Sequence, residues 1–529
     1  MIKQLFLTCL TIFAFASLQP LFFSQHMVLA ESLQPPTQVY GQIELGSNTL
    51  PVGISPALNG GVWVAEANTD SIVHIDASGL VDRTYNISTQ KHLAWIWSMV
   101  QDNYGTLWIA DETQPYLLRL NISTGNITLI PTSDVRPYSL AYDKESGRLW
   151  FTSFDESSLG YIDVNRSGVQ LGNIIKLSGT SGIGAGPAGI ALGKGGSVYV
   201  AESLNSTIDE FFPNMTLARI WYLPEGSEPV GLSLDPARNL LWFTNHASSL
   251  FGFVNLQNDS IVQYSTSVTF SQGLPIVSLP YWVHLSSDGL VWFNEHFGNK
   301  IAAFNLTGRT LTEFLIPQND SSPLQLAVDD ISGKVWFTEF TTGVVGYISE
   351  QVVQNSQNVR IISPESLSLS PFNTNFEVDV PTGSSGLLLS GSVNRLGVLN
   401  TNMSVQISAS VNGTVYQITF SSPSLSYGNY TLTACIPDMV VSYSPKLLAN
   451  YCSIIYLRYS FTQAQANYYV VFPVVALLAI TFYYFFYQRR AKNRIATPND
   501  AGVSKGKDFI PSFFCAILWL CKPGLLKLG

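Results

Sequence analysis

Residues 291–305 read VWFNEHFGNKIAAFN: an apolar run with an aromatic second residue, an acidic end, a turn and a second apolar run. Six other stretches share this pattern, among them LWFTNHASSLFGFVN at 241–255 and VWFTEFTTGVVGYIS at 335–349. The aromatic residue recurs every 42 to 50 residues, at Trp63, Trp108, Trp150, Tyr199, Trp242, Trp292 and Trp336. Short apolar runs between Gly and Asp turns indicate strands rather than helices.

A repeat of this length accommodates four strands, which is one blade of a β-propeller. The sequence therefore predicts an all-β chain with a seven-bladed β-propeller over residues 38–350. One blade cannot bury both of its faces, so we expect the repeated aromatic residue to fill the seam between neighbouring blades. The seventh repeat ends after its third strand. We therefore expect QVYGQIEL at 38–45 to supply its outer strand and close the ring.

The aromatic repeat stops before residues 358–461, where short alternating strands such as FEVDVP and TVYQITF are separated by turns. About seven strands in roughly 100 residues is typical of an immunoglobulin-like β-sandwich. Its expected role is a stalk, although a binding role stays open. Cys435 and Cys452 are the only cysteines between the two long apolar segments of the chain, and they predict one disulfide.

Those two apolar segments indicate secretion and membrane anchoring. Residues 1–30 read as a signal peptide, with an uncleaved anchor as the alternative. Residues 468–487 carry no charge and have the length of a membrane span, whereas a buried core helix would be shorter. The basic tail at 488–529 follows directly, which predicts a single-pass cell-membrane protein with its N-terminal part outside and its tail in the cytoplasm.

Charge and glycosylation signals agree with this topology. The chain carries 27 Lys+Arg and 36 Asp+Glu, so nucleic acid is not an expected partner. Every Asn-x-Ser/Thr sequon lies between the two apolar segments, and the glycosylation candidates are Asn86, Asn121, Asn126, Asn165, Asn205, Asn214, Asn258, Asn305, Asn319, Asn402, Asn412 and Asn429.

The repeats, with Pro-x-Gly-Ile ahead of several of them, resemble the streptogramin B lyase (virginiamycin B lyase-like) propellers over about residues 38–350. The resemblance implies a Mg ion, a Glu-Pro-His opening of the last blade, a Pro-His one blade earlier and a Glu at the end of the last aromatic strand. This chain keeps the last as Glu339, but has Ser322-Pro323-Leu324 and Pro280-Tyr281 at the other two places. Elimination needs a base near neutral pH, so the missing histidines argue against streptogramin lyase activity.

The residues that end the aromatic strands form the first candidate site. They are Glu66, Asp111, Ser153, Glu202, Asn245, Glu295 and Glu339. If these positions surround a central channel, their carboxylates would repel, and a Ca or Mg ion would relieve that repulsion. Glu295, Glu339 and Asn245 are the candidate ligands of such an ion. The alternative is that strand-end carboxylates bond to turn amides or face solvent.

The same end of the ring supplies candidate binding residues. They comprise Glu66, Asp111, Glu202, His246, His296, Trp97, Tyr138 and Tyr281. Aromatic faces beside acids suit sugars or peptides, and packing in the core is the competing interpretation. Two functions stay open. One is a recognition or scaffold protein for a glycan, a peptide or another surface protein. The other is a lyase or hydrolase whose site is rebuilt around Glu295, Glu339, His246 and His296.

Overall fold

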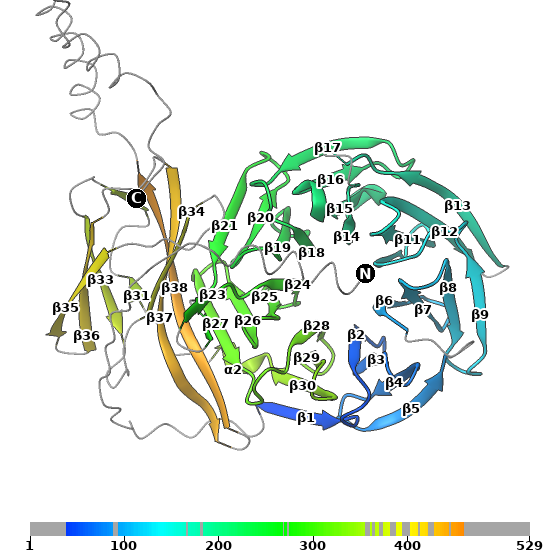
Figure 1. Cartoon of the computed structure of the whole chain (residues 1–529), viewed down its shortest axis with the longest axis horizontal. Coiled ribbons are helices and arrows are strands. Elements are labelled where there is room, and N and C mark those ends of the chain that lie inside the picture. The colour runs from blue at the N-terminus through cyan, green and yellow to red at the C-terminus, as the bar shows by residue number, and fades with distance from the viewer. Residues whose placement is uncertain are drawn as a thin grey trace, which may run out of the picture. The chain divides into compact units, whose positions relative to one another are not determined.

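The computed structural model describes residues 39–87, 94–165, 168–179, 184–267, 269–271 and 274–354, and beyond them the strands between residues 360 and 459. Antiparallel four-stranded units surround a common axis, which confirms the β-propeller prediction (Figure 1). In each unit the first strand lies nearest the axis and the last lies at the rim.

The units follow one another along the chain. The first has β2 (Pro51–Pro56), β3 (Val62–Glu66), β4 (Ser71–Ile75) and β5 (Val81–Asn86). The second has β6 (Ile96–Gln101), β7 (Thr106–Asp111), β8 (Tyr116–Asn121) and β9 (Ile127–Pro131). The third has β10 (Leu140–Asp143), β11 (Arg148–Ser153), β12 (Ser158–Asn165) and β13 (Gly168–Lys176). The fourth has β14 (Pro187–Leu192), β15 (Val198–Glu202), β16 (Thr207–Phe211) and β17 (Leu217–Tyr222), with 3-10 turns at Lys194–Gly196 and Ser203–Asn205.

The fifth unit has β18 (Pro229–Asp235), β19 (Leu240–Asn245), β20 (Leu250–Asn255) and β21 (Ile261–Ser265). A small hairpin of β22 (Thr269–Ser271) and β23 (Leu274–Ile276) precedes the sixth repeat and accounts for the long interval between Trp242 and Trp292. The sixth repeat has β24 (Pro280–Leu285), β25 (Val291–Glu295), β26 (Lys300–Asn305) and β27 (Thr310–Leu315). The last has β28 (Pro323–Asp329), β29 (Lys334–Glu339) and β30 (Val344–Ser349), followed by helix α2 (Gln351–Gln354).

Six units are self-contained four-stranded sheets, where the sequence predicts seven separate blades. The sixth repeat differs because its outer strand β27 pairs with β38 (Lys446–Tyr459), so β24–β27 become half of an eight-stranded sheet. Burial shows the consequence. The outer strands β5 and β17 are largely exposed, whereas most of β27 is buried beneath its added neighbour.

The N-terminal strand closes the ring. β1 (Tyr40–Glu44) pairs antiparallel with β30 and becomes the outer strand of the last blade (Figure 1). This confirms the closure predicted for residues 38–45. Tyr40 is fully buried there, which ties the first residues of the ring to the last.

The repeated aromatic residues fill the seams between blades. Trp336 of β29 packs against Val62 and Val64 of the first blade, and Trp63 of that blade packs against Leu107 and Ile109 of the second. The same relation continues around the ring. The structural role predicted for these residues is therefore confirmed.

A hydrogen bond also joins neighbouring blades near the axis. The residue before the end of the second strand donates to a carbonyl at the start of the next blade's first strand, as Thr152 does to Ala188 at 2.9 Å and Thr338 does to Val52 at 3.2 Å. Thr244 donates likewise to Tyr281. At the seam that Thr244 bridges, the Gly of the Pro-x-Gly motif permits this approach, since a Cβ on Gly231 would lie 2.8 Å from the carbonyl oxygen of Tyr281. These contacts fix the residue that follows each proline.

The chain after the ring forms strands in two sheets. One sheet contains β31 (Arg360–Ile361), β33 (Thr374–Val380), β36 (Gly413–Ser421) and β35 (Asn402–Ser410). The other joins β38 to β37 (Gly428–Tyr443), β34 (Leu388–Val393) and β32 (Ser366–Leu369), and continues into β27. Cys435 and Cys452 face each other across β37 and β38 and form a disulfide. An immunoglobulin-like sandwich remains a prediction, because this second sheet is shared with the propeller.

The described residues contain no helix long and apolar enough to cross a membrane. The predicted signal peptide at 1–30, the predicted span at 468–487 and the basic tail at 488–529 all lie outside the described residues.

Candidate functional site

The strand-end acids do not line the axis of the ring. They end the second strand of each blade, whereas the first strand is the innermost (Figure 1). The carboxylates of Glu66, Asp111 and Glu202 accept hydrogen bonds within their own blades. The carboxylate of Glu66 accepts from the Thr69 hydroxyl at 2.5 Å, and that of Asp111 accepts from Thr113 at 2.7 Å. The alternative interpretation, in which strand-end acids bond to turn residues, therefore describes both positions.

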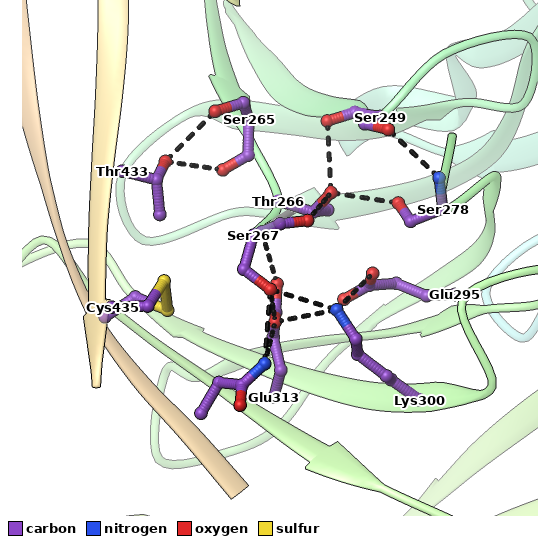
Figure 2. A network of polar contacts seen from close by, with 12 residues as sticks. Ser249, Ser265, Thr266, Ser267, Ser278, Glu295, Lys300, Glu313, Thr433 and Cys435 are labelled. Carbon is purple, nitrogen blue, oxygen red and sulfur yellow. Dashed lines mark hydrogen bonds and ion pairs between the residues drawn. A yellow bond between two sulfur atoms is a disulfide. The ribbon is translucent and has the colours of Figure 1, made fainter. Parts of the chain in front are cut away.

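Glu295 lies in a buried ionic network beneath the C-terminal hairpin. The ammonium of Lys300 is 3.6 Å from the carboxylate of Glu295 and 3.0 Å from that of Glu313 (Figure 2). The hydroxyl of Ser267, which follows β21, donates a further hydrogen bond to Glu313, and so does the amide of Asn450 on β38. Burial, and then the negative charge of Glu313, raises the pKa of Glu295 to about 8. The Lys300 ammonium and the Ser267 contacts outweigh burial at Glu313 and lower its pKa. The network thus joins the sixth blade to the hairpin.

Glu339 and Asn245 have surroundings of their own. The Glu339 carboxylate accepts from Gln42 at 3.0 Å and from the Tyr40 hydroxyl at 3.3 Å, both on the closing strand. Asn245 is fully buried, and neither atom of its amide has a hydrogen-bond partner among the residues that the structure describes. In the part of the chain that the structure describes, no group of three His, Cys, Asp or Glu residues is arranged to hold a metal. A channel site built from Glu295, Glu339 and Asn245 gains no support from these contacts.

The residues that follow the prolines converge with Trp97, which follows Ile96 at the equivalent place of the second repeat. Val52, Trp97, Tyr138, Ala188, Val230, Tyr281 and Leu324 belong to two apolar clusters that share Trp97. We call these seven residues the axial cluster. Residues from all seven repeats can meet only at the axis, so the axial cluster fills the centre of the ring at one end. Tyr281 and Leu324 stand where the resemblance implies histidine, and in this chain they are packing residues.

Other aromatic rings surround the axial cluster. Trp95 lies 5.8 Å from both Trp97 and Phe340 between ring centroids, and Phe154 lies 5.7 Å from Tyr138. All are partly exposed except Tyr138, which is buried. Trp95, Phe154 and Phe340 were not identified from the sequence. A signal existed, since Phe154 and Phe340 directly follow second strands, as His246 and His296 do.

The two histidines complete this aromatic surface. The rings of His246 and His296 stack with centroids 5.6 Å apart and planes 7° from parallel, and Tyr281 lies 4.8 Å from His246. Glu228 lies 3.6 Å from Nδ1 of His246. The sequence-predicted residues Trp97, Tyr138, Tyr281, His246 and His296 are thus brought together. Glu66, Asp111 and Glu202 engage partners within their blades instead.

Burial decides the protonation of this surface. It raises the pKa of Tyr281 to about 12 and that of Tyr138 well above its ordinary value, and the two hydroxyls lie 2.9 Å apart. Burial, and then the nearby His246, lowers the pKa of His296 to about 4. Both phenols therefore stay protonated at neutral pH, and His296 stays uncharged. The surface offers aromatic faces, two hydroxyls and a neutral imidazole, but no strong base among these three side chains.

Acidic groups flank the same aromatic rings. Burial raises the pKa of Glu112 to about 7, against the opposing influence of the adjacent Trp97 indole. Arg136 lies between Glu156, at 2.8 Å, and Asp155, at 2.7 Å. Carboxylates beside the rings can accept hydrogen bonds from a hydroxyl-rich ligand.

The sequons lie largely at the surface. Among those whose side chains are described, Asn205 and Asn305 are partly buried, and the exposed ones are Asn86, Asn121, Asn126, Asn165, Asn214, Asn258 and Asn319. The Asn205 amide donates to Glu202 at 2.5 Å, so a glycan at Asn205 would have to share this amide with that contact.

Comparison with solved structures supports the fold. A streptogramin B lyase structure matches with 20% sequence identity and a TM-score of 0.50, over 59% of this chain and 97% of the lyase. A catalytically inactive virginiamycin B lyase from Staphylococcus aureus with quinupristin matches with 20% identity and a TM-score of 0.50, over 59% of this chain and 99% of that one. No family model and no curated protein matches the sequence. At this identity the likeness shows a shared propeller fold.

Proposed function

We propose that this chain is a membrane-anchored recognition protein whose propeller binds a glycan at the aromatic surface around the axial cluster. The observation that carries the proposal is the convergence of Trp95, Trp97, Tyr281, His246 and His296 at one end of the ring. The C–H faces of a sugar ring pack on aromatic faces, and its hydroxyls can donate to nearby carboxylates such as Glu228.

The membrane part of the proposal rests on sequence. An uncharged 20-residue segment at 468–487 precedes QRRAKNR, and basic residues favour the cytoplasmic side. The exposure of most described sequons supports an extracytoplasmic propeller. A surface protein held in this way would present its aromatic surface to glycans outside the cell.

A glycan array probed with the full-length protein in detergent micelles tests the ligand class. We expect saccharide binding that falls at least tenfold in Trp95→Ala, because that ring lies at the partly exposed edge of the aromatic surface. Tyr222→Ala is the matched control, since Tyr222 is 69% exposed on the rim strand β17. Thermal unfolding of each variant checks its fold. Equal binding by Trp95→Ala and the unchanged protein would place the ligand elsewhere, and binding only to a peptide panel would replace the glycan with a peptide.

One observation favours the second function, a lyase or hydrolase. The stacked His246 and His296 lie beside Tyr281, which occupies the place of a histidine in the lyases that the repeats resemble. An uncharged His296 can accept a proton, although its low pKa makes it a weak base. Turnover of an ester or glycoside panel that is lost in His246→Ala/His296→Ala and kept in His74→Ala would establish this function. No turnover in any of the three proteins would remove it.

A further inference from the structure

Blade six shows how the propeller accommodates two buried acids in one sheet. Glu295 ends β25, Lys300 begins β26 opposite it, and Glu313 lies on β27. All three side chains are at least 95% buried. The charge is acceptable because the Lys300 ammonium contacts both carboxylates (Figure 2). A buried acid pair in this fold is thus matched by a cation.

Blade four also has two buried acids near the end of its second strand, but no lysine lies between them. Glu202 ends β15 as Glu295 ends β25, and Thr207 lies opposite Glu202 where Lys300 lies opposite Glu295. The second acid is Asp209, two residues further along β16. Glu202, Thr207 and Asp209 are 3%, 4% and 5% exposed.

The oxygens of this cluster lack partners of opposite charge. Within the described ranges, no Lys, Arg or His forms an ion pair with Glu202 or Asp209. Oδ1 of Asp209 and the hydroxyl of Thr207 are buried without a hydrogen-bond partner, although the Thr207 side chain lies near enough to both carboxyls to influence their pKa values. Two acids and an unpaired hydroxyl therefore point at one another inside the sheet.

Neutral oxygens extend the set toward the surface. The amide nitrogen of Asn205 donates to Oε2 of Glu202 at 2.5 Å and to the carbonyl oxygen of Ser178 at 3.2 Å, and a flip of this amide would present its oxygen there instead. Carboxylates, a hydroxyl, an amide oxygen and a backbone carbonyl are the ligands that Ca²⁺ takes, and neither Cys nor His is among them. Ca²⁺ tolerates irregular sets of six to eight oxygens including water, whereas Mg²⁺ demands near-octahedral geometry.

We propose that blade four binds one Ca²⁺ between Glu202 and Asp209, with Thr207 and Asn205 as neutral ligands. The ion occupies the role that Lys300 has in blade six. This site involves two carboxylates only, is separate from the aromatic surface, and does not depend on the glycan-binding proposal.

Thermal unfolding of the full-length protein in detergent, stripped with EDTA, tests the site. We expect CaCl₂ to raise the apparent Tm by several degrees, since an ion that binds only the folded state stabilises it. The shift should vanish in Glu202→Gln/Asp209→Asn and persist in the matched control Glu66→Gln, a strand-end acid with a hydroxyl partner. No Ca²⁺ shift in the unchanged protein, or an equal shift in the double variant, would overturn the proposal. The first outcome would mean that the two carboxyls share a proton.

Terbium luminescence gives a second measurement should the double variant fail to fold. Trp221 lies on β17, opposite Ile208 of β16, and its neighbour Ile220 faces Asp209. Excitation of the Trp221 indole should therefore sensitise Tb³⁺ in the site. We expect Ca²⁺ to displace Tb³⁺ and quench this emission. Tyr222 lies opposite Thr207 and can also sensitise the ion, so the emission should be lost in Trp221→Phe/Tyr222→Phe while the Ca²⁺-dependent Tm shift remains. Emission unchanged in this double variant would place the ion outside blade four and refute the assignment.

Discussion

At the scale of single residues, each blade handles the polar residue at the end of its second strand in its own way. The carboxyl of Glu295 contacts the Lys300 ammonium, and that of Glu339 accepts from the neutral donors Gln42 and Tyr40. The side-chain amide of Asn245 has no hydrogen-bond partner in the described part of the chain. The repeat therefore sets the position of a polar group, and its neighbours in the sheet decide its charge. This explains why one strand-end position yields an ion pair in one blade and a cation-site candidate in another.

The Glu295 carboxyl predicts a pH dependence of stability. Its pKa is about 8 in the folded protein against an ordinary value of 4.5, so the folded state binds the proton more tightly. The free energy of unfolding should therefore fall as pH rises through this window. Glu295→Gln removes this loss. Between pH 5 and pH 8.5 we expect the free energy of unfolding of the variant, measured relative to that of the unchanged protein, to rise by at least about 1.4 kcal/mol. This is the free energy that corresponds to one pKa unit.

Chemical denaturation of the full-length protein at the two pH values measures this difference, with the exposed Glu145→Gln as the control. A Glu295→Gln difference that is constant with pH would mean that Glu295 is already ionised at pH 5.

At the scale of strands, close approach of the innermost strands holds neighbouring blades together. Gly189 of β14 abuts the backbone of Val230, and Gly53 of β2 abuts that of Ile96. The strand-two hydroxyls of Thr152 and Thr338 bond across two other seams, to the carbonyls of Ala188 and Val52. Where the Pro-x-Gly motif is present, its glycine is thus required for close packing of the two inner strands, and the residue before that glycine lies in the axial cluster.

Gly189→Ala tests this requirement. A Cβ there would lie 1.9 Å from the Val230 carbonyl oxygen, so the two strands must separate. We expect a loss of about 2 kcal/mol or more in the free energy of unfolding. Gly168→Ala on the rim strand β13 is the matched control, because a Cβ there meets nothing within 4 Å. Equal stability of the two variants would show that the inner seam is loosely packed.

At the scale of the molecule, two segments distant in sequence complete the ring. β1 supplies the outer strand of the last blade, and β38 extends the sixth repeat beyond its rim. The Lys300 network and the hydrogen bond between Ser265 and Thr433 tie the hairpin of β37 and β38 to the propeller (Figure 2). The propeller and this hairpin therefore share one continuous sheet.

Tyr40→Ala tests the closure. The ring of Tyr40 is fully buried against Phe337 at the junction of first and last strands. Removing such a ring typically costs roughly 3–5 kcal/mol. We expect the unfolding transition of the propeller in a thermal scan to move to lower temperature, with Tyr222→Ala unchanged. Loss of the β1 contacts in hydrogen exchange, with no change in Tm, would instead mean that the strand opens independently of the ring.

The sequence by itself determined the propeller, the seam role of Trp63 and its equivalents, and the closing strand, because these follow from a local pattern repeated at a fixed interval. It also identified Trp97, Tyr138 and Tyr281, because each follows the same position of the repeat. It did not identify Phe154 and Phe340, although both directly follow second strands as His246 and His296 do. Trp95 reaches this surface through its packing against Phe340 of the last blade, a contact that no local pattern encodes.

Only the tertiary structure decided where the strand-end acids point and what they meet. Glu295 meets Lys300 and Glu313 inside its own sheet, although the repeat alone suggested an acid facing the axis. The pairing of β27 with β38 joins residues more than a hundred positions apart, and no short-range pattern encodes such a contact. Local periodicity specifies strands and their order, whereas the direction of a polar side chain depends on which partner the completed sheet places beside it.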